Sequence, residues 1–66
     1  MNLKKFLYMY DAPYALTVIN DNNLKPIAKG DVYTVLHDKK NAEIMQHRVV
    51  AFGFYDGELA VRVEIK

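Results

Sequence analysis

The sequence predicts a small α+β protein. It is expected to be a single domain over residues 1–66, with elements in the order α-β-β-α-β-β, a mostly antiparallel sheet, and helices packed on one face. Three observations lead to this fold class. Apolar residues recur at helical spacing near the start of the chain, Gly30-Asp31 separates a β-prone segment from a short helical one, and Asp56-Gly57 lies between two runs rich in β-branched and aromatic residues.

The first helix is predicted between the N-cap Asn2 and Asp11. Pro13 disfavours helical backbone in the residue before it, so the helix should end near Asp11. Tyr8 and Met9 lie off the apolar face and become candidate contact residues. The apolar face itself consists of Leu3, Phe6, Leu7 and Tyr10.

Residues 14–20 and 24–29 are predicted to form a hairpin, because both are β-prone and an Asp-Asn-Asn turn separates them. The second strand contains Pro26, which cannot donate a ladder hydrogen bond, so this strand should lie at an edge or carry a bulge. Two registers remain open. A two-residue turn pairs Val18 with Lys25, and a three-residue loop pairs Val18 with Pro26.

A short helix is predicted over residues 32–37, with Asp31 as its N-cap. The alternative is a strand, because Val-Tyr-Thr-Val is also β-prone. A second short helical turn over residues 42–46 should place Ile44 and Met45 against the sheet.

The last hairpin is predicted to turn at Asp56-Gly57, the preferred pair for a two-residue type I′ turn. This register puts Arg48 opposite Ile65, Val49 opposite Glu64 and Ala51 opposite Arg62. Directly opposed residues share a face, so one face is assigned to the core: Val50, Phe52, Phe54, Leu59, Val61, Val63 and Ile65. The other face contains Val49, Ala51, Gly53, Tyr55, Glu58, Ala60, Arg62 and Glu64.

A domain of this size buries a small core, and the chain has no cysteine to staple it, so a homodimer or a protein partner is expected. The candidate interaction surface combines the exposed aromatic and apolar positions of the helices with the outer face of the last hairpin. Its residues are Tyr8, Met9, Tyr33, Val49, Ala51, Tyr55 and Arg62.

Catalytic, cofactor-binding and metal-binding residues are not predicted. The chain lacks cysteine and serine, and its glycines do not form a phosphate-binding loop. His37 and His47 are the only histidines, and their surroundings lack the three or four ligands of a zinc or iron site. We therefore expect a non-enzymatic, protein-binding accessory module without cofactors or metals.

The alternative function is nucleic-acid binding through basic and aromatic surface residues. The net charge of +1 is far from the strongly basic balance of most nucleic-acid binders, which makes this the second choice. The residues that would carry it are Lys4, Lys5, Lys25, Lys29 and Tyr8.

The amphipathic start, the strand ending in a polar turn, Gly30 before Val35-Leu36, and Arg48-Val49-Val50 leading into the last hairpin form a pattern that covers most of the chain. This pattern resembles short uncharacterised accessory proteins of bacterial phages and conjugative elements. The resemblance implies a role in a mobile genetic element, acting on a host or phage protein. No apolar run is long enough to span a membrane or serve as a signal peptide, so a cytoplasmic location is expected.

Overall fold

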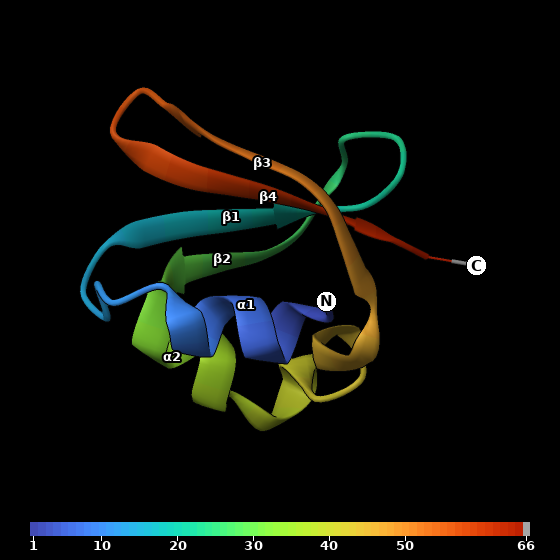
Figure 1. Ribbon diagram of the computed structural model, residues 1–66, viewed down its shortest axis with the longest axis horizontal. Helices are drawn as coiled ribbons and strands as arrows, with labels where there is room; N and C mark the ends of the chain where they lie inside the picture. Colours follow the sequence, from blue (N-terminus) through green and yellow to red (C-terminus); the bar gives the residue numbers. More distant parts are fainter. Residues whose placement is uncertain (66) are drawn as a thin grey trace.

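Two helices lie on one side of a four-stranded sheet in the computed structural model, which describes residues 1–65 (Figure 1). The predicted α+β class and the order of helices and strands are confirmed. The elements are α1 (Leu3–Met9), β1 (Leu16–Asn20), β2 (Pro26–Asp31), α2 (Val32–His37), the 3-10 helices η1 (Lys39–Asn41) and η2 (Ile44–Gln46), β3 (Arg48–Tyr55) and β4 (Glu58–Glu64).

The two hairpins lie side by side, so the strand order is β2-β1-β4-β3. Strands β1 and β2 pair antiparallel, as do β3 and β4, whereas β1 and β4 pair parallel (Figure 1). The central strands therefore come from the two hairpins, and β2 and β3 form the edges.

The core lies between the helices and the two central strands. The hydroxyl of Thr17, fully buried on β1, donates to the carbonyl of Leu59 at 2.8 Å, so its polar atom is satisfied. The buried apolar residues are Leu3, Leu7, Ile19, Val32, Val35, Met45, Leu59, Val61 and Val63. Met45 therefore lies in the core, as predicted, and Ile44 packs against it partly buried.

The first hairpin has neither of the predicted registers, because Val18 pairs with Lys29. The N–H of Asp21 donates to the carbonyl of Lys25 at 2.9 Å, so the loop covers residues 22–24, one position later than expected. A register shift near the end of β1 then adds one more residue to β2. The strand does lie at an edge and carries this irregularity, as its proline predicted.

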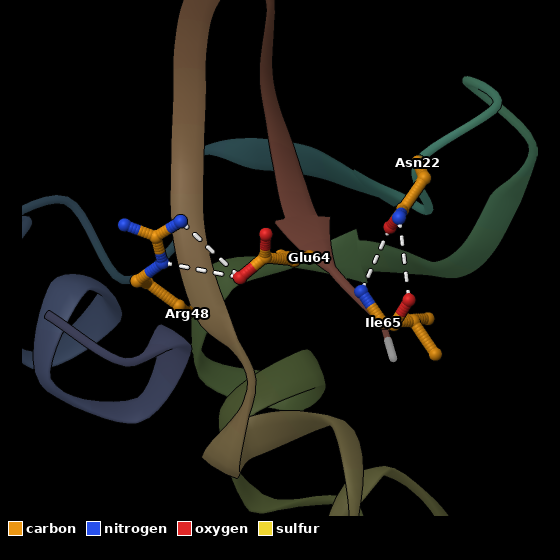
Figure 2. A network of polar contacts seen from close by, with 4 residues as sticks. All are labelled: Asn22, Arg48, Glu64 and Ile65. Carbon is orange, nitrogen blue, oxygen red and sulfur yellow. Dashed lines mark hydrogen bonds and ion pairs between the residues drawn. The ribbon is translucent and has the colours of Figure 1, made fainter.

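The side chain of Asn22 holds Ile65, the residue that follows β4 (Figure 2). The N–H of Ile65 donates to Asn22 Oδ1 at 2.7 Å, and Asn22 Nδ2 donates to the carbonyl of Ile65 at 3.2 Å. This amide presents a donor and an acceptor as a backbone peptide would. It therefore extends the pairing of β1 and β4 beyond the last residue of β1.

Residues 32–37 form a helix, so the strand alternative is wrong. The carboxylate of Asp31 accepts a hydrogen bond from the N–H of Thr34 at 2.7 Å, as predicted for an N-cap. The hydrogen bonds from the backbone and the side chain of Thr34 lower the pKa of Asp31 from its ordinary value of 3.8.

Asp31 therefore makes the stability of the domain sensitive to acid. A lowered folded-state pKa stabilises the fold above the unfolded pKa, and this contribution disappears as the pH falls from about 4 through the folded value. Asp31→Asn keeps a capping side chain without a titrating group. Urea denaturation near neutral pH and at about pH 3 measures the free energy of unfolding. Between these two pH values, this free energy should fall less for Asp31→Asn than for the wild type. Equal losses would show that Asp31 does not contribute.

The last hairpin turns at Asp56-Gly57 as predicted, with positive φ at both residues (53° and 78°), as a type I′ turn requires. A register shift between Val49 and Ala51 inserts Val50 as an extra residue. Beyond this bulge the predicted register is wrong, because Val49 pairs with Val63 and not with Glu64. The pairs on the turn side of the bulge are confirmed: Tyr55 with Glu58, Phe54 with Leu59, Phe52 with Val61, and Ala51 with Arg62.

The bulge also changes the environment of Arg48, which pairs with Glu64 and not with Ile65. Both Nε and Nη2 of Arg48 donate to Glu64 Oε1, at 3.3 and 3.2 Å (Figure 2). The guanidinium side chain is 64% exposed, so this ion pair contributes little to stability.

The predicted core assignment is wrong on β3. Val50, Phe52 and Phe54 are exposed, and Val49, predicted for the outer face, packs against the core. The buried partners of the two phenylalanines lie on β4, a central strand, whereas β3 is an edge strand. Helix α1 has 7 residues and is about 10 Å long, so it cannot cover a strand of 8 residues that is about 26 Å long.

Candidate protein-binding surface

The N-terminal segment fixes α1 beside the edge strand β3. Asn2 forms an antiparallel bridge with Arg48. The N–H of Val49 donates to the carbonyl of Met1, and the N–H of Leu3 donates to the carbonyl of His47, both at 2.9 Å. The helix begins at Leu3, with Asn2 Oδ1 accepting from the N–H of Lys5 at 2.9 Å. The first turn of α1 is thereby held against the first residues of β3.

Four aromatic side chains from α1, its C-cap Tyr10 and β3 meet on the helix side of the sheet; we call them the aromatic patch. Phe6 contacts Phe52, with ring centroids 5.0 Å apart, and Tyr10 lies 6.3 Å from Phe54. Phe6 and Tyr10 stack along the helix at 6.5 Å. These separations are those of favourable aromatic pairs. The patch stays largely open to solvent on the strand side, since Phe52 is 65% and Phe54 57% exposed.

A shallow apolar groove adjoins the aromatic patch between α1 and β3. The side chains that line it, all within residues 1–65, include no carboxylate, amine, guanidinium or imidazole group. Its lining residues are Met1, Phe6, Met9, Tyr10, Val49, Val50, Ala51 and Phe52. Such a surface fits an apolar partner rather than a charged ligand.

The outer edge of β3 is free over about three quarters of its length. The N-terminal segment occupies it at residues 47–49, and no other strand formed by residues 1–65 lies beside residues 50–55 on this side. Natural edge strands are commonly protected by charge, proline or a covering element. The other edge strand, β2, contains Pro26 and Lys29, whereas residues 49–55 contain no charged residue. The uncovered part of β3 is therefore suited to pair with another strand.

The structure brings together some of the predicted interaction residues. Met9, Val49 and Ala51 line the groove. Tyr55 and Arg62 share a second shallow depression with Ala51 on the face of the sheet away from the helices.

Tyr8 and Tyr33 lie elsewhere, because both contact His37 on α2. The ring centroids are 6.3 Å apart for Tyr8 and 4.4 Å apart for Tyr33. The seven predicted residues therefore occupy three places on the molecule and do not form one surface.

The residues missing from the prediction are Phe52, Phe54 and Phe6. All three lie on predicted core faces, and hydrophobic patterning assigns every large apolar residue on such a face to the interior. The pattern held no signal that β3 lies at an edge. The uncharged run of residues 49–55 is the one feature that could have raised the question.

The lysines proposed for nucleic-acid binding are not brought together. Lys29 pairs with Val18 on the sheet face away from the helices, whereas Lys4 and Lys5 project from α1 on the helix side. Over residues 1–65, no group of three or more His, Cys, Asp or Glu side chains is placed to hold a metal ion. No helix in this part of the chain is long and apolar enough to cross a membrane.

Fold and surface together define the class: a two-layer α+β domain with a bare sheet face and an uncovered aromatic edge. No protein-family model, curated protein or solved structure matches the chain.

Proposed function

We propose that this protein is a small non-enzymatic protein-binding module, and that it binds an extended apolar segment of a protein along residues 50–55 of β3. One observation carries the proposal: the free edge of β3 lies beside exposed phenylalanines on a stretch without charge. An added strand would satisfy the free backbone groups, and its alternate side chains would cover Phe52 and Phe54. The resemblance to mobile-element accessory proteins implies that the module acts on a host or phage protein.

Site-specific photo-crosslinking tests the proposal. Phe54 is replaced by the photoreactive amino acid benzoylphenylalanine, which preserves an aromatic ring, and the protein is irradiated in the cells that produce it. The matched control carries the same group at Tyr14, which is 88% exposed and lies outside the groove. We expect protein adducts from position 54 at least about tenfold more abundant than from position 14, since only position 54 is held against a partner.

A second substitution links the adduct to the strand edge. Phe52→Pro, compared with Phe52→Ala, removes a backbone N–H that alternation from the Tyr55–Glu58 pair directs away from β4 and toward the free edge. It should reduce the adducts from position 54 while circular dichroism shows that the fold is retained. Adducts with nucleic acid, or equal yields from positions 54 and 14, would contradict the proposed function.

A further inference from the structure

We infer that the strand taken up by this edge is β3 of a second copy of the chain, paired antiparallel with Gly53 on the two-fold axis. This inference rests on the proposed function and names its partner. The result would be one continuous sheet across two chains, with the helices of both on the same side.

The hairpin geometry identifies the free backbone groups of β3. In a two-residue hairpin the residues that close the turn exchange both hydrogen bonds, and bonded and non-bonded pairs then alternate. Tyr55 pairs with Glu58 at the turn, so Tyr55 and Gly53 direct their N–H and C=O groups toward β4. Phe52 and Phe54 direct theirs toward the free edge.

The N-terminal segment restricts the register of any added strand. With Phe52 opposite Phe52 of a second copy, Tyr55 of that copy would fall opposite Val49, where the edge already bonds to Met1. With Phe54 opposite Phe54, only that pair would bond between the strands. With Gly53 opposite Gly53, each Phe52 pairs with Phe54 of the other copy, and all the free groups of these residues are used.

The side chains favour the same register. On the helix side, Phe52 and Phe54 of both copies would form one aromatic cluster across the axis. On the other face, Tyr55 would lie opposite Ala51 of the second copy, a small residue that leaves room for the ring. Tyr55 also covers its own Gly53, since a Cβ at Gly53 would lie 2.9 Å from the Tyr55 ring. Small residues therefore lie at both close contacts of the inferred dimer: Gly53 where the two backbones meet, and Ala51 where the Tyr55 ring of the other copy lies.

The exposed aromatic side chains offer a substantial part of the area that each partner of a stable dimer buries. Aromatic side chains can bury about 150–250 Å² each. With exposures of 65%, 57% and 68%, Phe52, Phe54 and Tyr55 together offer roughly 400 Å². This is about half of the ~800 Å² that one partner of a stable interface contributes. Met9 and Val50, 65% and 43% exposed, lie in the adjoining groove and add to it.

Identity of the two strands causes no electrostatic conflict. Two-fold symmetry repeats every charge, and like charges directly opposite each other destabilise a sheet. Residues 49–55 contain no charged side chain, so the free edge can face its own copy without repulsion.

A cysteine scan tests the inference directly, because the chain contains no natural cysteine. Residues opposed in a non-hydrogen-bonded antiparallel pair have Cα atoms about 4.5 Å apart, which suits a disulfide. We expect Gly53→Cys to form a disulfide-linked dimer under mild oxidation at least about tenfold faster than Tyr14→Cys. Position 14 is a demanding control because it is 88% exposed and therefore freely accessible to a cysteine of another chain.

Sedimentation equilibrium of the cysteine-free wild type and of Phe54→Asp completes the test. The wild type should reach a dimer at micromolar concentrations, and Phe54→Asp should weaken dimerisation by roughly 100-fold or more, because each dimer would bury two unpaired charges. A wild-type dimer without disulfide formation at position 53 would overturn the inferred pairing. A wild type that stays monomeric would overturn the second copy as partner, whereas adducts of position 54 with other proteins would still support the proposed function.

Discussion

Leu59→Ala is expected to lower the free energy of unfolding by about 2–5 kcal/mol, because it opens a cavity in the core between the central strands and the helices. Leu59 is 1% exposed and has Phe54 as its cross-strand partner. The same truncation of Phe54, which is 57% exposed, should cost only about 1 kcal/mol, mainly through the lost contact with Tyr10. A domain of 66 residues has a total stability of roughly 3–10 kcal/mol, so Leu59→Ala removes a large part of it.

Urea denaturation at low protein concentration, where self-association does not contribute, measures both changes. The two variants form a matched pair, since the residues lie on the same face of the same hairpin. If both residues belonged to the core, as hydrophobic patterning predicts, their losses would be similar. Similar losses would therefore contradict the edge position of β3.

Gly30→Ala is expected to destabilise the domain by about 1–3 kcal/mol through its backbone. Gly30 has a φ of 150°, a backbone conformation that residues with a side chain rarely adopt. Space is not the obstacle, because the added Cβ would lie 3.6 Å from Val35 Cγ2, an ordinary contact. The strain would act where β2 ends and α2 begins.

Gly53→Ala provides the control for this prediction. It makes the same chemical change within a strand, and the three atoms nearest to the added Cβ all belong to the exposed, movable ring of Tyr55. Its effect on the unfolding of the monomer should be close to zero, since alanine also reduces the freedom of the unfolded chain. Thermal melts in which both alanine variants lose equal stability would show that the φ of Gly30 is not the cause.

Local signals predicted the local structure correctly. Asp56-Gly57 determines its turn through the positive φ of both residues, and Asp31 caps α2 with its own side chain. The register of the first hairpin could not be predicted in the same way, because the choice of loop depended on Asp21 bonding across the turn and on a bulge. The pairing of Val49 could not be predicted either, because the bulge at Val50 shifts the register of β3 against β4.

The candidate surface depended on strand order, which leaves no local signal. Phe52 and Val61 are paired, apolar and on one face, yet the first is exposed and the second is fully buried. The difference arises from the parallel contact of β1 with β4, which makes β4 central and leaves β3 at the edge. Periodicity reports which side chains share a face, but whether a neighbouring strand or helix covers that face is a property of the whole fold.

The parallel contact of β1 with β4 also has a consequence for biosynthesis. A ribosome delivers the chain from its N-terminus, so β1 has only β2 beside it until residues 58–64 emerge. A lone two-stranded hairpin is at best marginally stable in water. The sheet therefore cannot be completed before β4 has been synthesised, and until then β1 lacks the neighbour that makes it a central strand.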